Sequence, residues 1–251
     1  PEFTEFVRSD NSDSSHYHSL QSSLRARFSD DLSIDLDYTW SRTLAFTSQS
    51  QTGWWISRPQ NNQKLWLERG PTGEDIPHRL VANFIYEIPW PGLARNPVTE
   101  ALVSGWQLSG ILTAQSGEPV NIIQSSAYSQ SRPDFIGTSH QEAYLDDGLQ
   151  YLDPAAFGQL PIANESGATI RPGTLGRNVF RVPGYWNANF SVSKFFAVSE
   201  GTQLRLKADL FNALNQTHFN AISNDINSAS FGRFTQTRGA RVVQFSLRFS
   251  F

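Results

Sequence analysis

Residues 32–41 alternate strictly between apolar and polar side chains, and this feature limits the possible folds most severely. Successive side chains of a β-strand point to opposite faces of its sheet. The segment therefore predicts a strand with one apolar face and one polar face. The apolar set is Leu32, Ile34, Leu36, Tyr38 and Trp40; the polar set is Ser33, Asp35, Asp37, Thr39 and Ser41.

The end of the chain repeats the pattern. Its apolar set is Val243, Phe245, Leu247, Phe249 and Phe251, and the residues between them are polar. Weaker copies occupy residues 18–28, 79–88, 106–115, 186–193 and 203–210. These seven segments approach the roughly 9 to 11 residues that a tilted membrane strand needs. Because soluble sheets also alternate, this pattern alone does not establish a membrane protein.

The lengths of the links between strands distinguish a membrane barrel from a soluble sheet. The links between the predicted strands alternate between long ones, such as 42–77, 120–184 and 211–241, and shorter ones, such as 29–31, 89–104 and 197–201. Long and short links then fall at opposite ends of the sheet, as in outer-membrane barrels with long extracellular loops and short periplasmic turns. We therefore predict an all-β fold, about seven antiparallel strands of a larger transmembrane β-barrel.

Aromatic side chains cluster where the predicted strands begin or end, which is typical of the two interfacial girdles of a membrane barrel. They are Tyr38, Trp40, Trp106, Tyr185, Trp186, Phe195 and Phe196. The alternative is that these rings form the core of a soluble sheet.

Composition narrows the classes further. The formal net charge is −3 with 17% charged residues, so no basic tract predicts nucleic-acid binding. No run approaches the roughly 18 to 20 apolar residues of a membrane helix. The chain starts at Pro1, contains no Met and lacks a signal-like segment, which predicts a fragment of a longer protein.

No motif predicts an enzyme, a metal site or a cofactor. Cysteine is absent, which excludes thiolate ligands and nucleophiles, and no phosphate-binding, zinc-protease or serine-hydrolase pattern occurs. His16 and His18 are spaced for a metal on one strand face, but no third ligand lies nearby in the sequence.

The chain resembles TonB-dependent receptors of the Oar-like type, which carry a carboxypeptidase-regulatory-like domain. The resemblance lies in eight segments in family order and covers nearly the whole chain: residues 16–43, 69–89, 104–122, 132–137, 152–157, 173–196, 204–219 and 239–251. It implies that residues 1–251 are the C-terminal part of a receptor barrel of roughly 22 strands, without its plug and N-terminal strands. The partners that it implies are outer-membrane lipid, the rest of the same barrel with its plug, the TonB complex and the barrel-assembly machinery. The apolar C-terminal strand would be the segment used in assembly.

Two sets of residues become candidates for function. The expected lumen-facing set, which would keep the interior wet and contact the plug, is Arg25, Arg27, Asp35, Asp37, Arg79, Glu87, Gln107, Lys207, Asp209 and Arg248. The loop aromatics that would stack on a ligand, or pack the loops, are Trp54, Trp55, Trp66, Tyr128, Phe135, Tyr144 and Tyr151.

Two other functions are compatible with these strands. A passive porin or a structural or adhesive barrel would use the same strands without TonB coupling, and sequence upstream of Pro1 would distinguish it from a receptor. A soluble all-β binding module would be monomeric in buffer and would need no detergent.

Overall fold

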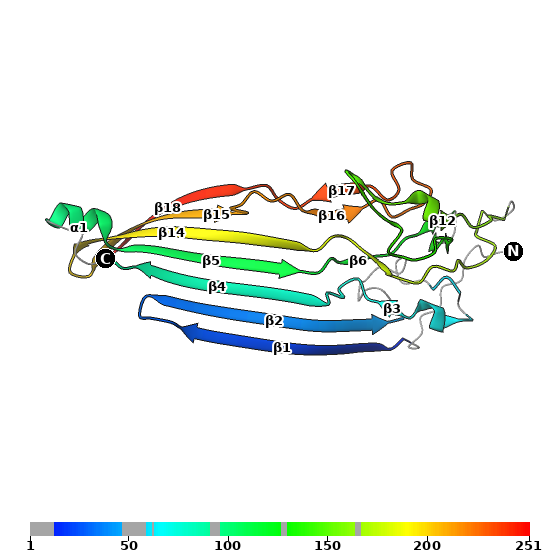
Figure 1. Cartoon of the computed structure of the whole chain (residues 1–251), viewed down its shortest axis with the longest axis horizontal. Coiled ribbons are helices and arrows are strands. Elements are labelled where there is room, and N and C mark those ends of the chain that lie inside the picture. The colour runs from blue at the N-terminus through cyan, green and yellow to red at the C-terminus, as the bar shows by residue number, and fades with distance from the viewer. Residues whose placement is uncertain (1–12, 47–58, 62, 91–95, 127–129, 164–166) are drawn as a thin grey trace, which may run out of the picture.

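The computed structural model describes residues 13–46, 59–61, 63–90, 96–126, 130–163 and 167–251. Seven long strands form one sheet (Figure 1). They are β1 (Ser15–Arg27), β2 (Leu32–Ala45), β4 (His78–Ile88), β5 (Trp106–Gln115), β14 (Tyr185–Ser199), β15 (Thr202–Phe211) and β18 (Val242–Ser250). Each contains one of the seven predicted segments. The short strand β3 (Gly70–Pro71) adds to the outer end of β2.

All these strands pair antiparallel and in chain order, β1-β2-β4-β5-β14-β15-β18. Each link reverses the direction of the chain and leads into the neighbouring strand, so each strand pairs with the one before it, as in the wall of an up-and-down barrel. The sheet is open in this chain, so β1 and β18 are its edges. The fold is therefore the predicted all-β antiparallel barrel portion.

The links also fall as predicted. The short turn after β1, the link from β4 to β5 and the turn after β14 lie at the end that carries the C-terminus (Figure 1). The three long links gather at the opposite end. One detail differs: β14 continues through residues expected in a turn, so only Glu200 and Gly201 join it to β15. Gly201 has a positive φ of 77°, which a glycine adopts without steric cost.

The link between β4 and β5 contains helix α1 (Pro97–Val103). Asn96 caps its start. The Asn96 side chain accepts from the backbone N–H of Thr99, and the Thr99 hydroxyl accepts from the backbone N–H of Asn96. This reciprocal capping box, with Pro97 in the first turn, satisfies free N–H groups and stabilises a short helix. The described part of the chain has no helix long and apolar enough to cross a membrane.

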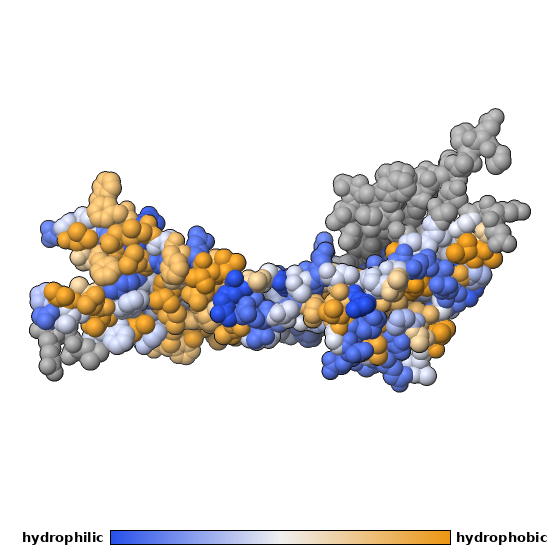
Figure 2. Space-filling model, turned by 90° about the horizontal axis from the view of Figure 1, so that it is seen from above, coloured by the Kyte–Doolittle hydropathy of each residue, from blue (hydrophilic) through white to orange (hydrophobic). Residues whose placement is uncertain are grey.

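Register places the alternating residues in rows across the sheet. One apolar row aligns Tyr38, Leu80, Ala114 and Trp186 near the long-link end. Another aligns Ile88, Trp106, Lys194, Leu206 and Leu247 near the short-turn end. Figure 2 shows hydrophobic side chains gathered over the short-turn part of the molecule.

Two of the expected girdle residues are on the other face. Tyr185 pairs with Gln115, and Phe195 pairs with Arg205, so both belong to the polar face. The prediction was wrong for these two residues because neighbours along a strand cannot share a face. Trp186 and Phe196 remain on the apolar face beside them.

Lys194 is the opposite exception, a cation on the apolar face. It is only 4% exposed, its Nζ donates to the Ser104 carbonyl, and it lies 4.7 Å from the Phe196 ring centre and 5.7 Å from that of Trp106. A lysine with its stem on apolar surface and its ammonium at the edge is typical of a membrane interface.

The long links are folded, not extended. We call their described residues (46, 59–61, 63–77, 116–126, 130–163, 167–184 and 212–241) the loop cap. Its strands and 3-10 helices are each two to four residues long. They are η1 (Leu65–Glu68), β6 (Pro119–Val120), β7 (Gln124–Ser125), β8 (Gln130–Ser131), β9 (Asp134–Phe135), β10 (Tyr144–Asp147), β11 (Gln150–Leu152), η2 (Pro154–Ala156), β12 (Phe157–Gly158), β13 (Phe180–Arg181), β16 (Phe219–Ile222) and β17 (Phe234–Thr237).

The largest buried apolar cluster lies in this cap. The cap members of that cluster are Ile122, Ala143, Leu152, Ala156, Phe157, Leu175, Phe180, Val182, Ile222 and Phe231. They come from two different long links. The sheet, by contrast, leaves the large side chains of its apolar face exposed, as at Phe245 and Leu247.

Candidate functional site

The polar face of the sheet contains all ten residues predicted to face a lumen. Register pairs Arg25 with Asp35, Glu87 with Gln107, and Arg205 with Arg248. Continuing these rows across β14 and β15 places Lys207 and Asp209 on the same side. The face is therefore mainly polar along the strands, with Val81, Ile85 and Ile111 as apolar residues in its rows.

Charges on this face are hydrogen-bonded locally. The Ser23 hydroxyl donates to Asp37 at 2.5 Å across β1 and β2. Lys207 lies 2.6 Å from the Asp209 carboxylate, which also accepts from Ser191. Such pairs keep charged groups solvated or neutralised along a wet surface. Their arrangement suits contact with water, a plug or a polar solute.

Above the polar face, one buried carboxylate joins two long links. Asp75 is fully buried; its Oδ1 accepts from the backbone N–H of Thr43 at 2.6 Å, and its Oδ2 accepts from Arg42 at 3.2 Å and from Arg181. Arg181 also donates to the Gly117 carbonyl at 3.0 Å. A buried charge is tolerated only when it is paired and hydrogen-bonded. The Thr43 N–H, Arg42 and Arg181 together meet this requirement for the Asp75 carboxylate.

A second buried pair joins the same two links. Arg132 forms a fork with Glu68, at 2.6 and 3.2 Å, and both side chains are about 5% exposed or less. The Arg132 guanidinium also donates to the carbonyls of Leu67 and Leu175. A planar guanidinium with this many acceptors is held in one orientation.

Arg177 ties the cap to the end of β2. Its guanidinium donates to the carbonyls of Ala45 and Phe46. Burial lowers the pKa of Arg177 to about 10, with the nearby charge of Glu68 opposing that shift. Its neighbour Asn178 donates to the Pro71 carbonyl at 2.7 Å.

Two of the predicted ligand-contact aromatics, Tyr144 and Tyr151, pack inside the cap. Their rings lie 5.2 Å apart, and Tyr151 stacks on Phe234 at 4.7 Å. The Tyr144 hydroxyl accepts from the backbone N–H of Arg181 at 2.9 Å. Burial raises the pKa of both phenols. Their geometry is that of packing residues, and a ligand contact by either stays a prediction.

The other two described loop aromatics lie in different surroundings. Trp66 lies on η1 and is 64% exposed, whereas Phe135 packs against Phe157 and Phe180 at about 6 Å. Trp54, Trp55 and Tyr128 lie outside the described residues. Of the loop aromatics that the structure describes, Trp66 is the exposed ring, whereas Phe135, Tyr144 and Tyr151 are half-buried.

Where the cap meets the polar face, a cluster lies around Tyr185. The Arg238 guanidinium is 3.8 Å from the Tyr185 ring centre and 3.2 Å from Glu118, and the His218 ring lies 6.0 Å from Tyr185. Both His218 Nε2 and Arg238 Nε are buried without a hydrogen-bond partner. Arg238 Nε is a donor, and His218 Nε2 donates or accepts according to its tautomer, so the cluster contains two unsatisfied polar atoms beneath its surface.

Sequence reasoning missed this cluster and the buried ion pairs. Glu68 and Arg132 are 64 residues apart, and Arg181 and Asp75 are 106 residues apart. Nothing local marks such pairs, since each residue alone looks like an ordinary surface charge. The only available signal was that the links are too long for simple turns.

Within the described part of the chain, no three His, Asp or Glu side chains gather to hold a metal ion. His16 and His18 are both exposed on β1.

The sequence matches a family model described as "Outer membrane beta barrel domain" over residues 1–244. The chain belongs to this outer membrane β-barrel domain family. That membership fixes its place in the cell as the outer membrane, and the apolar face of the sheet is the face that meets lipid. By the same rule, the loop cap is extracellular, and α1 is periplasmic with the short turns.

A solved structure also resembles this outer membrane β-barrel domain, the outer membrane transporter YddB from Escherichia coli. The TM-score is 0.54 at 12% identity, covering 96% of this chain and 26% of that one. At this identity the likeness shows a shared fold, and the chain spans about a quarter of that transporter's length. No curated protein matches the sequence. Together the comparisons describe an outer-membrane β-barrel family and a shared barrel fold.

Proposed function

We propose that this chain forms the C-terminal wall and part of the extracellular cap of an Oar-like, TonB-dependent receptor that takes up a small organic ligand. The observation that carries this proposal is a folded cap at the long-link end of a sheet whose one face presents polar side chains from all seven long strands. The fold likeness to an outer membrane transporter and the order of the eight family-like segments support it.

The packing of the cap favours gated uptake over passive flow. Buried ion pairs join the β2–β4 link to the β5–β14 link, and the apolar core joins the β5–β14 link to the β15–β18 link. Burying charges in this way is costly unless an ordered cap serves a purpose. A passive pore needs an open mouth, whereas a receptor needs a fixed surface that selects its cargo. In this proposal, ligand enters past Trp66 and meets the Tyr185 cluster before it reaches the polar face.

The proposal includes partners in addition to the ligand. Upstream strands of the same protein would pair with the free edges of β1 and β18, because unpaired backbone groups in lipid cost several kcal/mol each. A plug would contact the ten polar-face residues, the TonB complex would supply energy, and the assembly machinery would bind the apolar β18.

Energy dependence tests the function directly. The complete protein would be produced in cells with and without TonB, and uptake of a ferric hydroxamate, a maltooligosaccharide and a short peptide would be measured. We expect uptake of one of them to need both TonB and the proton-motive force. In parallel, vesicles containing the purified protein should not swell in small sugars. Swelling, or uptake unaffected by loss of TonB, would instead indicate a passive porin.

A further inference from the structure

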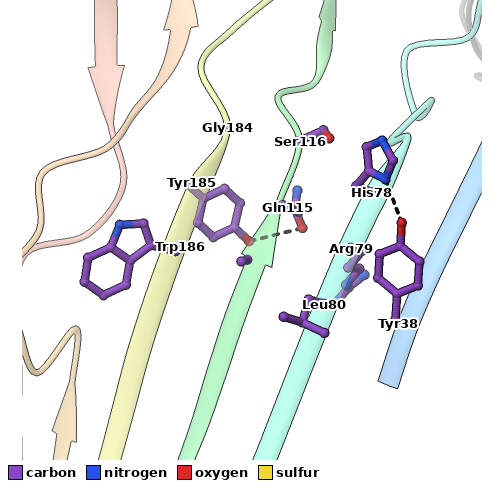
Figure 3. Close-up of a pocket in the computed structure, with 10 residues that line it drawn as sticks. Tyr38, His78, Arg79, Leu80, Gln115, Ser116, Gly184, Tyr185 and Trp186 are labelled. Atoms are coloured by element: carbon purple, nitrogen blue, oxygen red, sulfur yellow. Dashed lines mark hydrogen bonds between the residues drawn. The ribbon is translucent and has the colours of Figure 1, made fainter. Parts of the chain in front are cut away.

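A groove of about 400 Å³ opens on the sheet near the extracellular end of β4, β5 and β14 (Figure 3). Register places its principal side chains, those of Tyr38, His78, Leu80, Ala114 and Trp186, on the apolar face. The volume lies at the lower end of the roughly 300–1,000 Å³ of ligand pockets. The groove therefore faces lipid and not the lumen.

The floor of the groove is made of small residues. Ala114, Ser116 and Gly184 lie between the larger side chains of Tyr38 and Leu80 on one side and Trp186 on the other. A Cβ at Gly184 would come within 2.8 Å of the Gln115 carbonyl, so this position needs a glycine for close strand approach. The depression therefore follows directly from these three residues.

Each side of the groove is formed by an aromatic residue whose ring contacts a histidine ring. On one side, the Tyr38 hydroxyl is 2.8 Å from His78 Nδ1, and the two rings stack (Figure 3). On the other side, the edge of His218 meets Trp186, with ring centres 6.2 Å apart. Both sides are thus fixed in place before any molecule enters, which lowers the entropic cost of binding.

Polarity changes along the groove in the direction of the strands. Leu80 and Ala114 lie toward the middle of the sheet, whereas His78 and Ser116 lie one row nearer the loop cap. A molecule filling this space would be apolar toward the bilayer centre and would meet hydrogen-bonding groups toward the surface. A membrane lipid in the outer leaflet has this orientation, because its acyl chain lies below its ester and headgroup oxygens.

We propose that this groove is a specific site for one outer-leaflet lipid. One acyl chain lies on Leu80 and Ala114 between Tyr38 and Trp186, and the His78 imidazole and Ser116 hydroxyl donate to its ester or headgroup oxygens. The argument for this occupant is continuity: the groove is part of the face that meets lipid throughout the sheet. Because His218 also contacts Tyr185, the lipid site adjoins the cluster on the lumen side.

The test is lipid retention by the complete protein. The protein would be reconstituted in phosphatidylethanolamine and phosphatidylglycerol vesicles, with and without lipopolysaccharide, and then exchanged into lipid-free detergent. Mass spectrometry of the intact protein would count the lipids that remain. We expect one retained lipid per chain, and the two vesicle types identify its class.

Ala114→Trp fills the groove and should abolish retention. Leu206→Trp is the matched control, since Leu206 lies on the same apolar face and is 44% exposed but is not part of the groove. His78→Phe keeps a ring beside Tyr38 but removes the nitrogen atoms, and should speed lipid exchange about three- to ten-fold. Heat-dependent migration on gels would verify that each variant is folded.

Equal retention by Ala114→Trp and the native protein would overturn the proposal, as would equal loss in Leu206→Trp. Failure of the native protein to retain any lipid would also overturn it. These outcomes do not depend on TonB or on cargo, so they leave the proposed uptake function unaffected.

Discussion

Asp75 and Arg181, 106 residues apart in the chain, form an ion pair in which the carboxylate is completely buried. This pair fastens the link after β2 to the link after β5. It lies directly above the sheet, because Asp75 also binds the Thr43 backbone N–H in β2. Asp75 is therefore one of the side chains that anchor the cap to the wall, together with Arg177 at the end of β2.

Replacing Asp75 by Asn should loosen the cap. The amide oxygen can still accept from Thr43, but Arg181 loses its counter-charge in a mostly buried position, at a cost of about 3 kcal/mol. Hydrogen exchange of amides in residues 69–76 and 177–183 should become faster. The control is Asp30→Asn, whose partner Arg27 and own side chain are both exposed, and which should have little effect. Equal protection in the two variants would contradict the anchoring role.

Acid should destabilise the cap through Asp134. The Arg171 hydrogen bond lowers the pKa of Asp134 below its usual value near 3.8. Because the folded pKa is the lower one, this stabilisation is complete above about pH 4 and is lost as the pH falls through the folded pKa. Proteolysis of the cap should therefore increase below pH 4 in the native protein. Asp134→Asn should show that susceptibility already at pH 7, with a smaller further change in acid.

Gly117→Ala should prevent the cap from closing on β5. A Cβ at Gly117 would lie 1.6 Å from the Val182 carbonyl oxygen, so the backbone must shift, at a cost of about 3 kcal/mol. Gly239→Ala is the matched control, because nothing lies within 4 Å of its added Cβ. Urea unfolding of the complete protein in vesicles would compare the two. A tolerated Gly117→Ala would refute the close packing.

A charge on the apolar face should impair membrane insertion. Ile34 belongs to a central row with Phe84, Gly110 and Phe190, so Ile34→Arg should cost about 2–4 kcal/mol and lower the folded yield. Ser33→Arg, one residue earlier and on the polar face, should fold normally. The folded fraction in outer membranes would be read from gel mobility before and after heating. If Ser33→Arg proved the more damaging change, the two faces would be assigned the wrong way round.

The sheet was predictable because its signals are local. A period of two in residues 32–41 fixes both the strand and its faces, and the Ser29 turn fixes the pairing of β1 with β2. The same local rule placed all ten polar-face residues. The prediction was wrong at Tyr185 and Phe195 because it followed the aromatic type of the residue and not this alternation along the strand.

The cap was not predictable from local patterns. Its strands are mostly two residues long, too short for any alternation to show. What holds them is contact between distant segments, such as Glu68 with Arg132 and Tyr151 with Phe234. The groove escaped notice for the same reason: Tyr38, His78 and Gly184 become neighbours of Ala114 and Ser116 only after the strands pair.

The location of the apolar core has an evolutionary consequence. Because the cap encloses its own core and closes its own ion pairs, its outer surface can accumulate substitutions without altering the residues that touch lipid. The strands, in turn, can drift among aliphatic side chains without disturbing what the exterior presents. The extracellular half can thus vary in sequence while the half that crosses the membrane continues to insert unchanged.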